Sequence, residues 1–347
     1  MKIDTSLPLY AVLLSGVLAL MSTPVSATSN DDDDNDYCTQ TANLVYRACG
    51  FEVQDSYLLA QAKCLNESDA KDRRDCYDEA RTARNDTAKL CRDQRTARLG
   101  ICVAVGEERY DPTFDEQNFQ VNFRSIAKPN RYFPLAIGSK WEFSGKGEQV
   151  KLEILDRTKQ IDGVTCVVLR DQVFVDGQLV EDTDDWFALD RDANAWYCGE
   201  EVKDYETFAD DRPATAELVA IDGSFKVGRD GTKAGVIFQA KPMLGETYRE
   251  EFSLANAEDV SSVMSTNYRY GADSELDRLV PAALARQLCN GDCVVLNAFT
   301  AASPGKVERK YYAPGIGFFL QVVPATGQTI QLVSCNVDPR CAALPRL

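Results

Sequence analysis

The chain has 347 residues, of which 44% are hydrophobic and 27% are charged, a composition typical of globular proteins and a length sufficient for two ordinary domains. Its formal net charge of −16 argues against nucleic acid as a partner, because phosphate binding needs clustered Lys and Arg. The absence of histidine from the sequence excludes a Ser-His-Asp triad, a Cys-His pair, and metal or haem sites that depend on histidine.

Residues 1–27 have the pattern of a secretory signal peptide. Lys2 gives the positive start, the segment 7–20 is apolar, and the triplet at 25–27 fits a cleavage site. The apolar segment is too short to cross the roughly 30 Å core of a bilayer. We therefore expect a secreted or periplasmic protein without a transmembrane segment. The acidic leader that follows, 28–36, is expected to be disordered.

Residues 37–104 predict a helical hairpin, because they lack proline and are rich in Ala, Arg, Leu, Asp and Glu. Their six cysteines are separated by 11, 15, 12, 15 and 11 residues, a symmetric series. At about 100° per residue, these steps keep the cysteines of each helix on one stripe. Pairing the outermost cysteines with each other, and so on inward, fits an antiparallel hairpin folded about residue 70. The predicted disulfides are Cys38–Cys102, Cys49–Cys91 and Cys64–Cys76.

The disulfides have a physical purpose in such a hairpin, since two helices alone bury little apolar surface. The alternative is a metal site made by the six thiols. Metal sites use short Cys pairs, and spacings of 11 to 15 residues spread these thiols too far along the helices. A cross-linked hairpin is chemically inert, so we expect it to serve as a rigid arm, a spacer or a docking surface.

Residues 105–131 predict a linker, residues 132–335 an antiparallel β domain, and residues 336–347 a tail. Short alternating or β-branched runs in the β domain are separated by Asp-Gly, Asn-Gly and Pro-Gly turns. One helix is expected at Asp273–Leu288. The expected strands are Gln149–Leu155, Val164–Val175, Gln178–Leu189, Trp196–Cys198, Thr247–Phe252, Val294–Thr300, Val307–Tyr312, Phe318–Val323 and Thr329–Val333.

A three-strand meander is expected over residues 164–198, with turns at 176–177 and 190–194. In this register Cys166 and Cys198 face the same residue of the middle strand, Phe187, from opposite sides. They would then lie about 9.5 Å apart, beyond the reach of a disulfide. Either the register slips, or both stay reduced, or they have other partners, and a bond between them is the first choice by elimination.

The last four cysteines predict two short loops closed by disulfides. Cys289 and Cys293 flank an Asn-Gly turn, and Cys335 and Cys341 would close a terminal loop. A zinc site with these four thiolates is the alternative, and an oxidising compartment argues against it.

Asp190, Asp192, Asn194 and Glu201 match the ligand spacing of a calcium loop, the one cofactor that the sequence suggests. The sixth position is Ala195, where the sharp turn of such a loop favours Gly, and strands flank it. A plain hairpin turn is therefore the favoured alternative.

The calcium motif lies in an acidic patch. Between positions 171 and 211, 14 acidic residues accompany only two basic ones. Such a patch could bind a cation or a basic protein surface, although most runs of charge are solvated faces.

We predict no catalytic residue. Ser125 and Lys128, and likewise Ser303 and Lys306, have the spacing of a Ser–Lys nucleophile, but that pattern needs the Ser at the start of a helix. Paired carboxylates for glycoside hydrolysis remain an alternative, although no signature marks them.

Two motifs carry a resemblance to a known group. The segment NRYFPL at 130–135, followed by Gly138 and Trp141, resembles the opening of a broad group of uncharacterised exported bacterial β proteins. The run RKYYAPGIG at 309–317 resembles a closing motif of the same group. A related pattern occurs in periplasmic sheets of the lipoprotein-carrier type, and this implies a half-open barrel with an apolar cavity. The resemblance covers about 130–335 and leaves out the hairpin.

Together these features predict an α+β protein in which a disulfide-stapled antiparallel helical hairpin precedes an antiparallel β barrel or sandwich. The favoured function is that of an exported, non-enzymatic binding or surface-structural protein whose hairpin positions the β module. The alternatives are a periplasmic carrier of an apolar ligand or lipid in a β cavity, and a histidine-free hydrolase that depends on carboxylates. The two parts are expected to fold independently, because the linker is irregular and polar.

Overall fold

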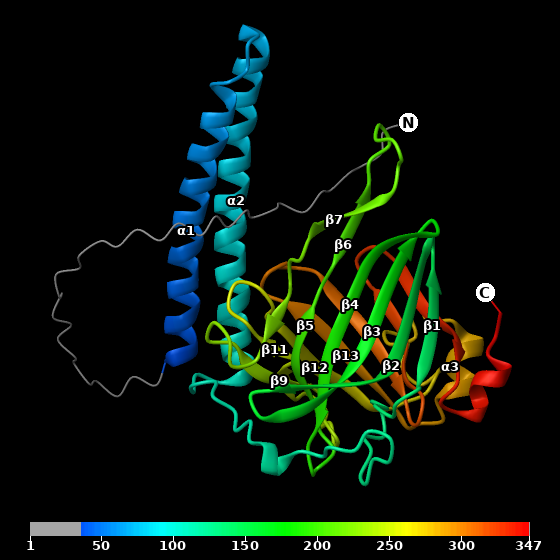
Figure 1. Cartoon of the computed structure of the whole chain (residues 1–347). Helices are drawn as coiled ribbons and strands as arrows, with labels where there is room; N and C mark the ends of the chain where they lie inside the picture. Colours follow the sequence, from blue (N-terminus) through cyan, green and yellow to red (C-terminus); the bar gives the residue numbers. More distant parts are fainter. Residues whose placement is uncertain (1–35, 347) are drawn as a thin grey trace. The chain divides into compact units, whose positions relative to one another are not determined.

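The computed structural model describes residues 36–346. The α+β prediction is confirmed, since two long helices are followed by a nearly closed antiparallel β barrel (Figure 1). The predicted signal peptide and all of the acidic leader except Asp36 lie outside the described residues. No helix between residues 36 and 346 is long and apolar enough to cross a membrane.

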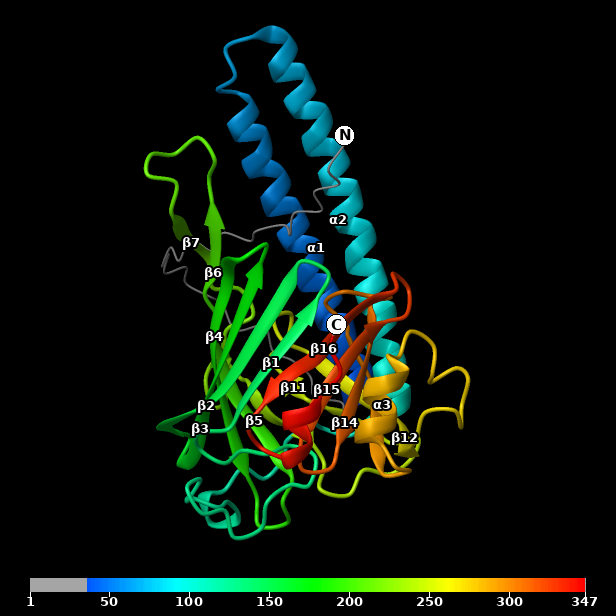
Figure 2. The ribbon, with the colours of Figure 1, turned by 90° about the vertical axis from the view of Figure 1, so that its right-hand side faces the viewer.

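The helical hairpin consists of α1 (Tyr37–Cys64) and α2 (Ala70–Val105), which run side by side in both views (Figures 1 and 2). Asp69 caps α2, because its carboxylate accepts hydrogen bonds from the backbone N–H groups of Lys71 at 2.7 Å and Asp72 at 3.1 Å. Later in the chain come α3 (Ala282–Leu288) and two short 3-10 helices, Glu116–Asn118 and Pro339–Ala343.

The three disulfides predicted across the hairpin are present. The Cα atoms of Cys38–Cys102, Cys49–Cys91 and Cys64–Cys76 are 5.5, 5.9 and 5.6 Å apart. The symmetric spacing of the cysteines therefore reflects an antiparallel pair of helices.

In the described part of the chain, sixteen strands form one sheet. They are β1 (Lys140–Gly145), β2 (Glu148–Ile161), β3 (Val164–Val175), β4 (Gln178–Leu189), β5 (Ala195–Glu201), β6 (Asp204–Thr207), β7 (Ala216–Ala220), β8 (Phe225–Lys226), β9 (Lys233–Phe238), β10 (Thr247–Arg249), β11 (Glu251–Phe252), β12 (Asp259–Tyr268), β13 (Cys293–Thr300), β14 (Val307–Ala313), β15 (Gly317–Val323) and β16 (Gln328–Cys335).

One short segment closes the barrel. The main path of the sheet runs β10-β12-β13-β14-β15-β16-β1-β2-β3-β4-β5-β9-β11. Its two ends, β10 and β11, are consecutive in the chain and are separated by Glu250 alone, with β10 paired to β12 and β11 paired to β9. A Cβ on Gly235 would lie 2.1 Å from the carbonyl oxygen of Glu250, so this close crossing needs glycine at position 235.

The expected linker packs against the barrel. Its Phe119 is buried on the outer face of β3–β5, where the ring centroids of Phe119 and Trp196 are 5.8 Å apart, and Phe123 belongs to the main hydrophobic core. The C-terminal part of α2, which is the base of the hairpin, also contacts the barrel. Arg98 forms an ion pair with Glu258, and the two side chains are only 7% and 3% exposed.

The structure corrects the expected register around Cys166 and Cys198, which form a disulfide with a Cα–Cα distance of 6.6 Å. The expectation that both face Phe187 is wrong. Phe187 pairs with Val167 on one side and Tyr197 on the other, and a bulge beside it leaves Cys198 as the extra residue of β5. The slipped register brings the two cysteines within reach of each other.

The remaining cysteines form the disulfides Cys289–Cys293 and Cys335–Cys341, so the zinc alternative with four thiolates is wrong. All 12 cysteines of the sequence lie in the described part and are paired. Six disulfides without a free thiol fit an oxidising compartment.

The expected helix at Asp273–Leu288 is shorter than predicted. Only Ala282–Leu288 is helical, since Pro281 cannot donate a backbone hydrogen bond and disfavours a helical residue before it. The segment before Pro281 consists of turns.

Candidate functional site

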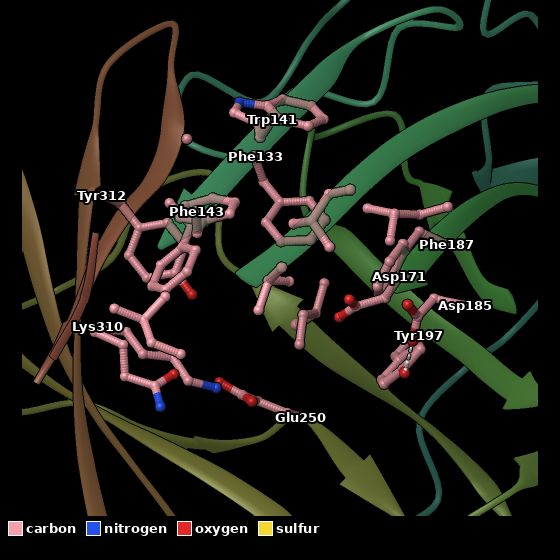
Figure 3. A pocket seen from close by; sticks show the side chains of 18 of the residues that line it. Phe133, Trp141, Phe143, Asp171, Asp185, Phe187, Tyr197, Glu250, Lys310 and Tyr312 are labelled. Atoms are coloured by element: carbon pink, nitrogen blue, oxygen red, sulfur yellow. Dashed lines mark hydrogen bonds between the residues drawn. The ribbon is translucent and has the colours of Figure 1, made fainter. Parts of the chain in front are cut away.

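The barrel contains a partly open cavity of about 350 Å³ (Figure 3). Side chains from β1–β5, β9, β12 and β14–β16 line it, together with the closing segment at 250–251. Successive side chains of a strand point to opposite faces, so alternate residues reach the interior, as Leu169, Asp171 and Val173 of β3 do. The volume lies at the lower end of the range of small-molecule sites, about 300–1,000 Å³.

Part of the lining is an aromatic wall. Phe133 meets Phe187 edge to face with ring centroids 5.2 Å apart, and Phe143 lies 5.0 Å from Phe318. Trp141 directs its Nε1–H to the carbonyl oxygen of Ile316 at 2.8 Å, which satisfies the one polar group of its ring. The aromatic wall comprises Phe133, Trp141, Phe143, Phe187, Tyr312 and Phe318.

Another part of the lining is an acidic group. It comprises Glu148, Asp171, Asp185, Glu250, Glu251 and Asp259. Among the described residues that line the cavity, Lys310 is the one basic side chain. Removing carboxylates from water is costly unless they are protonated or paired with cations. The cavity thus combines an apolar surface with an excess of buried acid.

A tyrosine joins two of the carboxyl groups beside the cavity. The hydroxyl of Tyr197 hydrogen-bonds Asp185, and it lies 3.1 Å from Oε2 of Glu200. Burial raises the pKa of Asp185 to about 7, and burial together with the charge of Asp185 raises that of Glu200 to about 9. One hydroxyl hydrogen cannot serve two carboxylates, so the trio is complete only when a carboxyl group carries an additional proton.

Asp171 has an unusual environment within the acidic group. It pairs with Thr183 across β3 and β4, and its side chain points into the cavity in Figure 3. Burial, and next the charge of Asp185, raise its pKa well above the usual value. Its Oδ1 atom is buried and has no hydrogen-bond partner in the part of the chain that the structure describes. A buried acceptor without a donor is costly, and this makes Asp171 a candidate to bind a donor from a ligand.

The closing segment supplies two further acids. Glu250 accepts a hydrogen bond from the buried hydroxyl of Ser261, and burial raises the pKa of Glu250. Burial, followed by the charge of Asp259, raises the pKa of Glu251 well above its usual value. Burial alone would lower the pKa of Lys310. The neighbouring carboxylates, of which Glu250 has the largest effect, outweigh burial and raise this pKa. The single cation of the lining is therefore held charged by acids around it.

The acidic patch of the sequence divides between two faces of the sheet. Asp182 and Asp184 point outward and form ion pairs with Arg170 at 2.5 Å and Arg157 at 2.8 Å. Asp185, their neighbour in the chain, faces the cavity. The patch is therefore only partly a solvated face, and the rest of it contributes to the interior.

The four candidate calcium ligands do not converge. Asp190 closes a turn, because its carboxylate accepts hydrogen bonds from the backbone N–H groups of Asp192 and Asn194, each at 2.8 Å. The Asp192 side chain is 89% exposed. Glu201 lies at the far end of β5 and pairs with Lys203 at 2.8 Å. The geometry is that of the hairpin turn considered as the alternative.

The Ser–Lys pairs also lie outside the cavity. Lys128 contacts the carbonyl oxygen of Arg191 at 3.2 Å, and the backbone N–H of Lys306 closes a turn onto Ser303. Neither Ser125 nor Ser303 begins a helix.

Sequence reasoning missed most of the lining. Glu250 and Glu251 fall within an expected strand, yet nothing local shows that the chain crosses from one sheet edge to the other at Glu250. Asp259 begins β12, whose serine-rich sequence is a poor strand signal. The one available signal was the acidic patch itself, which includes Asp171 and Asp185.

Comparisons with known proteins give no relative: no family model, no curated protein and no solved structure matches the chain. The resemblance to exported bacterial β proteins stays a prediction from the motifs at 130–141 and 309–317.

Proposed function

We propose that this protein is an exported, non-enzymatic binding protein that carries a small molecule inside its β barrel. The observation that supports this is the cavity of about 350 Å³, with its aromatic wall on one part and its acidic group on another. Structural barrels fill their interior with side chains, whereas ligand-binding barrels leave such a space. The carrier alternative considered for the sequence thus becomes the favoured form of the binding function.

The hairpin has a separate role in this proposal, which is to position the barrel. Its base is fixed by the Arg98–Glu258 ion pair and by contacts of Ile101 with Val260 and Ala301. Along α1 and at its C-cap residue, four large apolar side chains recur every seven residues and are exposed by more than half. They are Leu44, Phe51, Leu58 and Leu65. This stripe supports an interaction role for the arm.

A non-enzymatic function agrees with the chemistry of the acids. Glycoside hydrolysis needs two carboxyl groups that flank the substrate. Asp185 and Glu200 instead lie beside the same hydroxyl, that of Tyr197, which occupies the space between them.

Binding of the dye N-phenyl-1-naphthylamine, which is uncharged at neutral pH, tests the proposal. We expect saturable fluorescence enhancement with one site per chain. Val173→Trp places a large side chain in the cavity and should abolish the fluorescence enhancement. Gln172→Trp, on the opposite face of β3, should bind the dye like the wild type. Circular dichroism confirms that both variants fold. Absence of saturable binding to the wild type, or equal binding by a folded Val173→Trp variant, would overturn the proposed function.

A further inference from the structure

We propose that the ligand of this cavity is an amphiphilic amine, with a protonated amino group on the acidic group and an apolar body against the aromatic wall. This rests on the proposed function and names the chemical class of its ligand.

Charge is the first argument for this ligand. Within residues 36–346, six carboxyl groups and one basic side chain, Lys310, line the cavity, and the Nζ atom of Lys310 lies 3.8 Å from Oε2 of a further acid, Glu308. A fatty acid would bring a further carboxyl group into an interior that already holds several. A neutral apolar molecule would contact the aromatic wall but would leave the carboxyl groups without a partner. A cation offsets the cost of burying them.

The unpartnered oxygen of Asp171 is the second argument. An ammonium group has three N–H donors and no acceptor, which complements a surface made of carboxylate oxygens. Asp171 and Asp185 lie on the paired strands β3 and β4, and Asp185 is opposite Leu169, two residues from Asp171. Their carboxyl groups thus share one side of the cavity (Figure 3). An ammonium group there would give Asp171 the donor that it lacks.

The aromatic wall is the third argument. Phe187 stacks on Tyr197 with ring centroids 4.7 Å apart, so the wall continues into the tyrosine that holds Asp185. A ligand with its amino group at Asp171 and Asp185 would place its next carbon atoms on these rings. Aromatic faces attract cations and apolar groups alike.

The spacing of the acids favours an organic cation over a metal ion. Within residues 36–346, the one group of three cysteine or carboxylate ligand atoms within 4.8 Å of one another is Cys38, Cys102 and Glu107, and its two cysteines form a disulfide. The carboxylates of the cavity are therefore more dispersed than the ligands of a compact metal site.

Three eight-carbon compounds with different head groups test the inference. Octylamine, octan-1-ol and octanoate compete with N-phenyl-1-naphthylamine at pH 7. We expect octylamine to displace the dye at a concentration at least tenfold lower than octan-1-ol, and octanoate to be the weakest. Equal displacement by all three, with the dye still bound, would overturn the amine proposal and leave the binding function standing. Failure of the dye to bind would overturn the binding function itself.

Two variants assign the selectivity to the cavity. Asp171→Asn should reduce the advantage of octylamine over octan-1-ol at least threefold, whereas Asp176→Asn, the same change in the exposed turn after β3, should preserve it. Lys310→Met removes the competing cation and should increase the advantage. Dye binding by each variant shows that its barrel has folded. Unchanged selectivity in both Asp171→Asn and Lys310→Met would overturn the proposal.

Discussion

Neighbouring acids of β4 differ in their chemistry because alternate side chains of a strand face opposite sides. Asp184 points outward, where Arg157 pairs with it at 2.8 Å. Asp185 points inward, where burial raises its pKa to about 7 and the hydroxyl of Tyr197 is its partner. The same residue type thus makes a surface ion pair at one position and a protonation site at the next.

The raised pKa of Asp185 predicts how stability depends on pH. A free Asp has a pKa of about 3.9, so between that pH and about 7 the folded state binds more protons than the unfolded state. The free energy of unfolding therefore falls as pH rises through this window. We expect the free energy of unfolding of Asp185→Asn to equal that of the wild type near pH 4 and to be roughly 1–3 kcal/mol higher at pH 8.

Thermal unfolding between pH 4 and pH 9 measures this difference. Asp184→Asn is the matched control, and it should give no gain in stability at pH 8, because the change removes the ion pair with Arg157. An Asp185→Asn variant that melts below the wild type at pH 8 would contradict the assignment of a raised pKa.

At the scale of elements, the sequence correctly predicted the helices and strands that are determined by a local sequence pattern. The hairpin followed from six cysteine positions, and β3 and β4 have the predicted bounds because the Asp176-Gly177 turn separates two clear runs. Other elements depend on tertiary contacts. The strand β12 reads DVSSVMSTNY, and it forms because β10 and β13 pair with it. The cavity was foreseen only as an implication of a resemblance, since its lining comes from nine strands or more.

The closure of the barrel gives a prediction for Gly235. A methyl group there would lie 2.1 Å from the carbonyl oxygen of Glu250, so the backbone of the closing segment must move. We expect Gly235→Ala to lower the free energy of unfolding by roughly 1–3 kcal/mol, the usual cost of overpacking. It should also weaken dye binding, since Glu250 and Glu251 line the cavity.

Gly100→Ala is the control for this prediction. Gly100 lies inside α2, and nothing lies within 4 Å of the position that its Cβ would take. Alanine should stabilise that helix by up to about 1 kcal/mol. Chemical denaturation measures both variants, and a Gly235→Ala protein as stable as the wild type would show that the crossing tolerates a side chain.

At the scale of the whole molecule, the hairpin depends on two different kinds of interaction. Its base is held by packing and by the buried pair of Arg98 and Glu258, whereas the part beyond the barrel relies on cross-links such as Cys49–Cys91 and Cys64–Cys76. Two helices that share a narrow seam bury too little apolar surface to offset the entropy of ordering them.

Reduction should therefore melt the hairpin before the barrel. We expect the helical circular dichroism near 222 nm to fall on addition of a reductant, while the near-ultraviolet signal of Trp141, Trp186 and Trp196 persists, because all three tryptophans lie in the barrel. The double variant Cys49→Ala/Cys91→Ala should show the same order of loss on heating without reductant. Arg98 and Ile101 connect only the C-terminal part of α2 to the barrel. The helical signal should therefore be lost before the tryptophan signal. Their simultaneous loss would mean that these basal contacts couple the whole hairpin to the barrel in one cooperative unit.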